Sequence, residues 1–276
     1  MAVAIPEERR QMILGWVRSR SLVKPAELAE ELGVSLETIR RDFVALEEEG
    51  LLRRVYGGAT RTTPRAFELA FEKRRISHRE RKIAIAHLAA SLIDPGDTLI
   101  LDVGTTVAEL ADRLPLGHRG IVLTNSLLVA NALSSREGID VITSGGRVRP
   151  GDLACFGPVC EAFFRDYFAD KAFLGSGGIH PAMGLTDYYP DEIAIRRVVL
   201  EHAAERYVLA ESSKLGQVAL GKVCDLDALT ALITDDGAAA AEVDCLEKTG
   251  LTVMVATVDS SATAEEPTEE GQHARV

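Results

Sequence analysis

Hydrophobic positions near the start of the chain recur with the period of an α-helix. Met12, Ile13, Trp16 and Val17 form one apolar stripe over residues 7–20, and the arginines of this segment fall outside the stripe. The spacing predicts an amphipathic first helix whose stripe is buried in a core.

Two further helices are predicted directly after it. Pro25 suits the first position of a helix because it has no N–H group to leave unpaired, and Gly33 ends that helix. Ser35 is the expected N-cap of a third helix that runs to about residue 49. Two short helices that flank a tight turn form a helix-turn-helix.

The third predicted helix has one apolar face. Ile39, Phe43 and Leu46 follow the i, i+4, i+7 spacing and face the core. The side chains outside this face are charged or form hydrogen bonds: Ser35, Glu37, Thr38, Arg40 and Arg41. Such a face suits a recognition helix in a major groove, where guanidinium groups pair with guanine or phosphate. A solvated charged face is the alternative, since a single surface arginine is weak evidence.

A short hairpin is predicted after the third helix. Residues 51–56 have the pattern of a strand that carries Arg53, Arg54 and Tyr56, and two glycines follow as a turn. A hairpin beside a recognition helix forms a wing whose Arg and Tyr side chains contact phosphates. An ordinary hairpin without a DNA contact is the alternative.

From residue 82 onward, apolar strands alternate with amphipathic helices, which is the pattern of a mostly parallel sheet covered on both faces. Strands are expected at 98–102, 121–124, 141–143, 171–174, 207–210, 228–234 and 252–258. Helices are expected to begin near residues 84, 107, 127, 159, 192 and 238. The pattern therefore predicts an α/β domain after the helix-turn-helix.

Several of the predicted strands end in glycine, hydroxyl or amide residues. The segments are 102–106, 124–126, 144–146 and 175–178. Because ligands of open α/β sheets bind at the carboxyl ends of strands, and helix N-termini favour phosphate, these segments together predict an anion pocket. Any one of them alone is more often a helix cap or a tight turn.

Two charged residues near the predicted pocket have alternative interpretations. Glu192, at the start of a helix, is either a ligand contact or an acid matched to the helix dipole. Lys214, after the strand that ends at Ala210, is either a phosphate contact or a surface cation. The residues alone favour neither interpretation.

The net charge of −11 is unevenly distributed. Residues 1–82 contain 17 Lys and Arg against 13 Asp and Glu, a net +4, and the rest of the chain carries −15. A positive segment joined to an acidic body suits a protein whose first domain binds nucleic acid phosphates while its body repels them.

Other classes of protein are disfavoured by the composition. No apolar stretch approaches the roughly 20 residues that span a bilayer, and the charged N-terminus has no signal-peptide pattern, so a cytoplasmic protein without a membrane partner is expected. The four cysteines form no CxxC pair and are expected to be buried thiols rather than a redox or metal sensor. We expect neither a metal nor a cofactor.

Residues 23–59 resemble the N-terminal domain of DeoR-type bacterial transcriptional regulators nearly residue for residue. The matching pattern is Val-Ser at 34–35, Thr-Ile-Arg-Arg-Asp at 38–42, Leu-Glu at 46–47, Gly50, Arg54 and Gly-Gly-Ala at 57–59. Tyr56 departs by replacing the usual His, and Lys24 stands where Ser or Thr commonly caps the second helix. The resemblance implies double-stranded operator DNA as the partner, bound through Ser35, Glu37, Thr38, Arg40, Arg41, Arg53, Arg54 and Tyr56.

The resemblance extends over residues 5–258. It implies a C-terminal domain with a fold similar to ribose-5-phosphate isomerase that binds a phosphorylated sugar or polyol as inducer. It also implies a repressor of a carbohydrate-metabolism operon that acts as a homo-oligomer, a dimer or tetramer. The expected ligand-binding residues are Asp102, Gly104, Thr105, Thr106, Thr124, Asn125, Gly145, Gly146, Gly175, Gly178, Glu192 and Lys214, and Gly157, Asp170, Gly184 and Ser213 match the family as well.

A sugar-phosphate isomerase with an accessory DNA-binding domain is the alternative from another class. Isomerases of this fold resemble one another in an Asp-rich strand followed by Lys-Gly-Gly-Gly, whereas residues 170–176 here are DKAFLGS. The pair of residues for proton transfer is incomplete, so no enzyme activity and no catalytic residue are expected.

Four regions are expected along the chain. A winged helix-turn-helix occupies 1–60, a charged linker 61–81, and a sensor and oligomerisation domain 82–259. The tail at 260–276 is rich in Glu, Ala, Thr and Pro without a periodic apolar pattern, so it is expected to be disordered.

Overall fold

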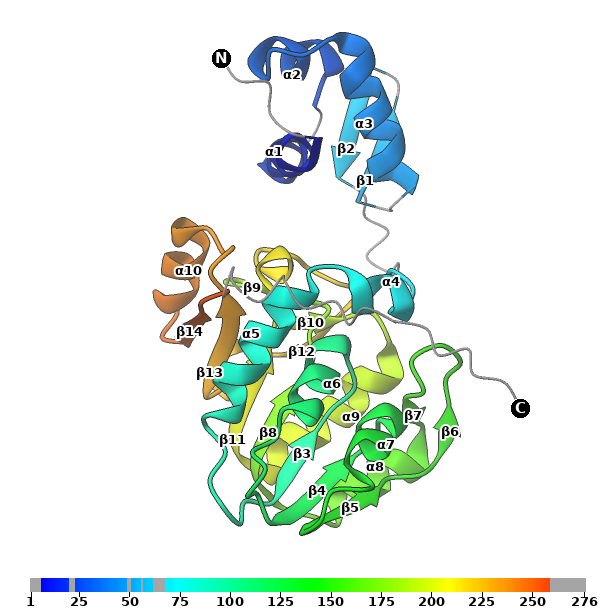
Figure 1. The fold of residues 1–276 in the computed structure, drawn as a ribbon, viewed down its shortest axis with the longest axis vertical. Helices are drawn as coiled ribbons and strands as arrows, with labels where there is room; N and C mark the ends of the chain where they lie inside the picture. The colour runs from blue at the N-terminus through cyan, green and yellow to red at the C-terminus, as the bar shows by residue number, and fades with distance from the viewer. Residues whose placement is uncertain (1–5, 20–22, 49–50, 56, 62–67, 259–276) are drawn as a thin grey trace, which may run out of the picture. The chain divides into compact units, whose positions relative to one another are not determined.

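The computed structural model describes residues 6–19, 23–48, 51–55, 57–61 and 68–258 of the 276. The chain divides into two compact units, Met1–Leu69 and Ala70–Val276. Figure 1 shows the elements of each unit, and the two are described separately below. The expected disordered tail at 260–276 and the predicted DNA contact Tyr56 lie outside the described residues.

The first unit is a helix-turn-helix followed by a hairpin. Its elements are α1 (Pro6–Ser19), α2 (Pro25–Glu31), α3 (Leu36–Glu48), β1 (Leu52–Val55) and β2 (Gly58–Arg61). The two strands pair antiparallel, from Leu52 opposite Arg61 to Val55 opposite Gly58. Val23 forms a bridge with Ala59, which ties the segment before α2 to the hairpin. The predicted winged helix-turn-helix is confirmed.

Local signals in the sequence explain the helix boundaries. Pro25 occupies the first turn of α2. The Ser35 hydroxyl accepts a hydrogen bond from the backbone N–H of Thr38 at 3.1 Å, which confirms the predicted N-cap of α3. Side chains from all three helices and both strands form one buried core: Ile13, Val17, Val23, Leu28, Ile39, Phe43, Leu46, Leu52 and Ala59.

The orientation of α1 differs from the predicted one. Met12, expected in the buried stripe, is 41% exposed, and Arg9, expected outside it, is buried. Arg9 Nε lies 2.5 Å from Asp42 Oδ2 in α3. The inward face therefore follows positions 9, 13 and 17, and an arginine occupies the first of them because a buried carboxylate balances its charge.

A parallel sheet forms the centre of the second unit. Its seven strands lie in the order β14-β13-β11-β8-β3-β4-β5, and every neighbouring pair is parallel. In chain order the strands are β3 (Leu99–Leu101), β4 (Gly120–Thr124), β5 (Ile139–Thr143), β8 (Ala169–Leu174), β11 (Ala203–Leu209), β13 (Ala231–Asp235) and β14 (Thr252–Ala256). All seven predicted strands are present, so the predicted α/β class is confirmed.

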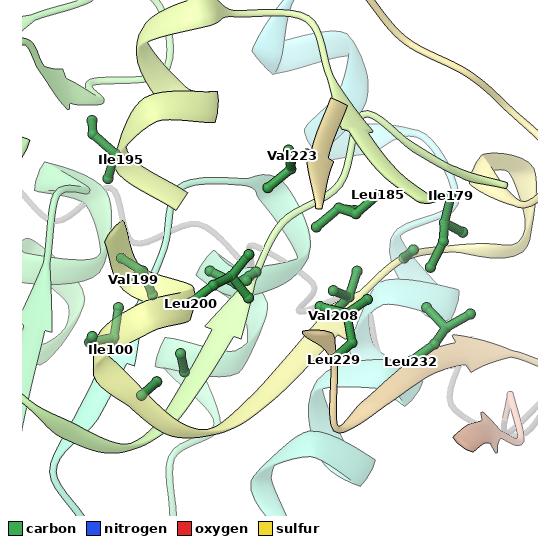
Figure 2. Close-up of a cluster of buried hydrophobic side chains, with 14 of the residues drawn as sticks. Ile100, Ile179, Leu185, Ile195, Val199, Leu200, Val208, Val223, Leu229 and Leu232 are labelled. Carbon is green, nitrogen blue, oxygen red and sulfur yellow. The ribbon is translucent and has the colours of Figure 1, made fainter. Parts of the chain in front are cut away.

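Helices cover both faces of this sheet (Figure 1). They are α5 (Arg79–Ala90), α6 (Thr105–Asp112), α7 (Leu127–Leu133), α8 (Pro158–Arg165), α9 (Pro190–His202) and α10 (Ala240–Glu247). Because successive side chains of a strand point to opposite faces, β3 supplies Ile100 to one core and Leu99 and Leu101 to the other. Figure 2 shows part of the first core, where residues of α9 lie beside Ile100 and other side chains of the sheet.

Two small antiparallel sheets were not predicted. A three-stranded antiparallel sheet has the order β12-β10-β9, with β9 at Gly178–His180, β10 at Gly184–Asp187 and β12 at Gly221–Cys224. A two-stranded hairpin joins β6 (Arg147–Val148) to β7 (Cys155–Phe156). Strands of two to four residues are too short to show an alternating pattern in the sequence.

A short helix, which was also not predicted, changes the expected domain boundary. The second unit begins at Ala70 rather than 82, and helix α4 (Phe71–Ile76) lies within the expected linker at 61–81. Phe71 is buried, and the buried ammonium group of Lys82 donates hydrogen bonds to the carbonyl oxygens of Arg74 and Ser77. These contacts hold α4 against α5, so the basic composition of the segment does not indicate an extended connector.

The cysteines are not uniformly buried. Cys155 and Cys160 are buried, as expected, whereas Cys224 is half-buried and Cys245 is exposed on α10. The expectation is therefore wrong for Cys245. Within the described residues, no helix is both long and apolar enough to cross a membrane.

Gly184, at the start of β10, has a φ of +76°, and a Cβ atom there would collide with the carbonyl oxygen of Cys224 in β12. We predict that Gly184→Ala lowers the free energy of unfolding of the second unit by about 3 kcal/mol, from backbone strain plus the clash. Gly250→Ala is the matched control, because Gly250 has a φ of +92° with open space around it, and should cost about 1 kcal/mol. Urea unfolding followed by circular dichroism measures both, and equal losses would contradict the prediction.

Asp42→Ala would remove the carboxylate that accepts hydrogen bonds from the buried Arg9 guanidinium. We predict that Asp42→Ala destabilises the first unit by about 3 kcal/mol. The chain has one tryptophan, Trp16 of α1, so its fluorescence reports unfolding of this unit alone. Glu37→Ala is the control, because Glu37 forms an exposed pair with Arg41 and should change stability by less than about 0.5 kcal/mol. An unchanged unfolding midpoint for Asp42→Ala would contradict the role of this pair.

Candidate functional site

Helix α3 presents the predicted DNA-contacting residues on its outer face. Ser35, Glu37, Arg40 and Arg41 are exposed, and Thr38 is half-buried. Glu37 Oε1 lies 3.6 Å from Arg41 Nε, and both side chains are largely exposed, so this pair is weak. The hydroxyl of Ser35 caps α3, so its main role on this face is to stabilise the helix.

The hairpin is fastened to α3 through Arg54. Its backbone N–H and its Nε both donate to the carboxylate of Glu47, at 2.8 and 2.6 Å. These hydrogen bonds lower the pKa of Glu47 below its ordinary value, so the carboxylate stays ionised. Arg53 lies opposite Thr60 in the hairpin, and its side chain lies outside the described residues.

In the second unit, the carboxyl ends of three neighbouring strands bring predicted ligand residues to one edge of the sheet. Strand β3 lies between β8 and β4, so Asp102 follows the central strand, Gly175 follows one neighbour and Asn125 follows the other. Asp102 Oδ2 accepts a hydrogen bond from the Gly175 N–H at 3.0 Å. The predicted convergence of these strand ends is therefore present.

A buried ion-pair network occupies this edge. The Arg196 guanidinium in α9 donates to Asp102 Oδ2 at 2.6 Å and to Asp187, and it lies 3.2 Å from Glu192 Oε2. All four side chains are buried. Asp102 and Glu192 therefore hold an arginine in place, which is a role the sequence analysis did not assign to them.

A second arginine joins the network from the β6–β7 hairpin. Arg149 pairs with Glu192 and with Asp152, and its guanidinium lies 3.8 Å from the ring centre of Tyr189. Glu192 thus bridges two arginines, one from a hairpin and one from its own helix. The sequence analysis missed both arginines, although Arg196 could have been noticed as a charge within the apolar segment 193–200.

The network shifts the pKa values of its carboxyl groups in opposite directions. Burial raises the pKa of Glu192 to about 8, and the neighbouring carboxylates of Asp187 and Asp102 add to this against the attraction of the arginines. Burial also opposes ionisation of Asp187, but the charge and hydrogen bonds of Arg196 outweigh it and hold the pKa of Asp187 below its ordinary value.

Two buried polar atoms at this edge have no hydrogen-bond partner within the described part of the chain. They are Asn125 Oδ1, after β4, and Ser176 Oγ, after β8. The Asn125 side chain is anchored by its Nδ2, which donates to the Cys155 carbonyl oxygen at 3.3 Å. An unsatisfied buried acceptor is costly, so these atoms mark places where a ligand hydroxyl can bind.

The first turn of α6 supplies backbone donors beside Asp102. Gly104 has a φ of +137° and precedes the helix, which begins with the buried residues Thr105 and Thr106. The N-cap residue Gly104 has no side chain that could cap this end of the helix. The first-turn N–H groups suit an anion such as phosphate.

Other predicted ligand residues have structural roles. The Thr124 hydroxyl donates to the Leu101 carbonyl oxygen at 2.6 Å and so ties β4 to β3. Gly146 allows close approach of Phe156 in the hairpin, and Gly178 packs its backbone against Gln217. Asp170 accepts from the Thr98 N–H at the amino end of β8, on the opposite edge of the sheet.

The remaining predicted residues lie around the edge without joining the network. Lys214 belongs to a short 3₁₀ helix, Ser212–Lys214, and its Nζ lies 5.7 Å from the Tyr188 ring centre. Gly145 lies in the turn between β5 and β6. Gly157 and Gly184 precede α8 and open β10. None of these residues hydrogen-bonds Asp102 or Glu192 within the residues that the structure describes.

Glu192 has a raised pKa in the folded protein, so the folded state holds a proton that the unfolded state releases above about pH 4.5. Its contribution to stability is full below that pH and is lost as the pH rises through about 8. We predict that Glu192→Gln removes this dependence, so the variant gains stability relative to the original protein between pH 5.5 and pH 8, roughly the window between the two pKa values. Urea unfolding at the two pH values measures it, and Glu201→Gln at an exposed position of α9 is the control. If the difference in free energy of unfolding between the two proteins were the same at both pH values, the prediction would be contradicted.

The comparisons with known proteins address both units. Residues 9–65 match the model of the DeoR-like helix-turn-helix domain, and residues 77–236 match the DeoR C terminal sensor domain. The chain is 35% identical over 240 residues to the HTH-type transcriptional regulator YulB of Bacillus subtilis, covering 87% of this chain and 93% of that protein. It is 32% identical to the HTH-type transcriptional repressor GlcR of the same organism, covering 92% and 97%.

Solved structures similar to the chain include ribose 5-phosphate isomerase A of Methanocaldococcus jannaschii. That chain is 19% identical, with a TM-score of 0.38, over 50% of this chain and 55% of the other. The two matching domain models together cover most of the chain, and relatives above 30% identity match nearly its whole length. The chain therefore belongs to the DeoR family of transcriptional regulators.

Proposed function

We propose that the protein is a sequence-specific DNA-binding repressor of a carbohydrate-metabolism operon, and that a phosphorylated sugar or polyol lowers its affinity for the operator. The relatives GlcR and YulB carry the names of transcriptional regulators, which supports the DNA-binding half. The observation that carries the proposal is the exposed pair Arg40 and Arg41 on α3 of a DeoR-like helix-turn-helix. In this arrangement α3 enters the major groove and the hairpin lies along the backbone.

The sensor half rests on the edge of the parallel sheet. The uncapped first turn of α6 is suited to the phosphate group, and the unpartnered Asn125 Oδ1 and Ser176 Oγ are suited to sugar hydroxyls. Asp102 and Glu192 hold Arg196 and Arg149, which shape this edge. We assign to these two carboxyl groups no direct contact with the ligand. Gly104, Thr105 and Thr106 are the residues that we assign to the phosphate.

A homo-oligomer, a dimer or tetramer, fits this function, because two helix-turn-helix units on repeated half-sites double the contacts with the operator. Such a protein acts on DNA in the cytoplasm. The linkage between the two ligands is reciprocal, so an effector that weakens operator binding itself binds less tightly to the DNA-bound form.

An isomerase activity is not supported by the arrangement of the carboxyl groups. Asp102 and Glu192 are both paired with the buried guanidinium of Arg196, so their oxygen atoms are already engaged by a side chain of the protein. Purified protein incubated with pentose phosphates should show no turnover.

Arg41→Ala tests the DNA-binding half. We predict about 5- to 150-fold weaker binding to a duplex from the region upstream of the protein's own or a neighbouring gene, because one good arginine contact contributes about 1–3 kcal/mol. Fluorescence anisotropy at fixed salt measures the affinity. Arg165→Ala removes the same charge from an exposed position on α8 and should bind like the original protein. Equal affinities for Arg41→Ala and Arg165→Ala would contradict the assignment of α3.

Asn125→Ala tests the sensor half. In an anisotropy titration with phosphorylated sugars and polyols, we predict that at least one weakens operator binding by the original protein. Asn125→Ala should retain operator affinity and lose this response, because the ligand loses a buried acceptor. Indifference of operator affinity to every compound in the panel would defeat the inducer proposal while leaving DNA binding intact.

A further inference from the structure

The first unit contains a hollow of about 480 Å³ beside the recognition helix. It lies where the start of α2, the start of α3 and the turn between β1 and β2 meet. The lining residues are Lys24, Pro25, Ala26, Leu36, Arg40, Phe43, Arg54, Gly57 and Gly58. Three of them are cations from three separate elements, and none is acidic, so the hollow is suited to an anion.

The three cations have donors to spare. Arg54 commits its Nε to Glu47, which fixes the guanidinium and leaves its Nη groups for another acceptor. Arg40 is exposed, and its side chain forms no ion pair with any described residue. The Lys24 side chain is 62% exposed, and its ammonium forms an ion pair with Glu27 Oε1 at 3.7 Å, beyond hydrogen-bond distance.

Lys24 also lacks the role that its position usually has. It is the N-cap residue of α2, and its side chain makes no capping hydrogen bond. The sequence resemblance places Ser or Thr at this position, where the hydroxyl caps the helix. A Ser, Thr, Asp or Asn side chain at this position stabilises a helix by accepting a hydrogen bond from a first-turn N–H group. This chain gives up that stabilisation and gains a positive charge at the rim of the hollow.

We propose that Lys24, together with Arg40 and Arg54, binds a backbone phosphate of the operator in this hollow. The inference rests on the proposed DNA-binding function. Arg40 is adjacent to Arg41 on α3, so a duplex that places α3 in its major groove brings a phosphate of the groove's edge toward the hollow. A compact ammonium suits a tetrahedral phosphate rather than the planar edge of a base.

The substitution Lys24→Ser separates phosphate binding from a structural role, because it should maintain or raise the stability of the first unit while it lowers DNA affinity. A serine can cap α2, so the unfolding midpoint of the first unit, followed by Trp16 fluorescence, should stay the same or rise. DNA binding should nevertheless weaken, since one phosphate contact is lost. If Lys24 had only a structural role, Lys24→Ser would leave DNA affinity unchanged or improve it, because the serine cap maintains or stabilises α2.

The experiment measures affinity of the full chain by anisotropy at several salt concentrations between 50 and 200 mM, a range in which phosphate contacts change affinity strongly. For Lys24→Ser and Lys24→Ala we expect the slope of log K against log salt to fall by about one unit, equally on operator and on unrelated duplex. The control Lys248→Ala removes the same charge from an exposed residue after α10 and should keep the full slope.

Distinct outcomes separate this inference from the proposed function. If the original protein binds no duplex at low salt, the DNA-binding proposal itself fails. If it binds and Lys24→Ser retains the full slope, the phosphate contact is overturned. It is overturned too if Lys24→Ser abolishes binding of inorganic phosphate, measured by calorimetry, but leaves the slope on DNA unchanged, because the hollow then takes a free anion rather than the backbone.

Discussion

The buried guanidinium of Arg196 joins the parts of the second unit that meet at the carboxyl edge of the parallel sheet. It joins Asp102, after the central strand β3, to Asp187 of the small antiparallel sheet and to Glu192 of its own helix. Breaking a buried ion pair by removing one partner leaves an uncompensated charge, so Arg196 and the carboxylates of Asp102 and Asp187 depend on one another. The loops that carry Gly104 and Gly175 are held in place by the same contacts.

The fold of both units could be predicted because their patterns are long and periodic. The inner strands β3, β8 and β13 of the parallel sheet are largely buried, and the apolar segments that form the sheet are separated by turn residues and amphipathic helices. Periodicity failed where elements are short, as in β9, β10 and β12, and where a charge replaces an apolar side chain. Arg9 is the clearest case, because its burial depends on Asp42 in another helix, and no local pattern reveals that partner.

The candidate sites were predicted in position more than in role. Asp102 and Glu192 lie where the strand ends and the family resemblance placed them, yet each holds an arginine that the sequence analysis had not considered. Thr124 and Gly178 maintain the sheets, and Asp170 lies at the opposite edge. Residue type and spacing indicate which loops meet, whereas hydrogen-bond partners depend on side chains distant in the chain. In the first unit, Arg54 combines a structural role with the predicted DNA contact. Glu47 anchors its Nε, and its remaining donors face outward.

The pair of Asp102 and Arg196 has a consequence for how the protein becomes functional during synthesis. The two residues are separated by 94 positions, with seven strands and three helices between them. Contacts of such long range form slowly, because a large loop must close before they contribute any stability. The helix-turn-helix unit, whose contacts span fewer residues and whose residues leave the ribosome first, can therefore fold before this pair forms. On the proposed function, a newly made chain passes through a stage in which the unit for DNA is folded and the unit for the metabolite is not.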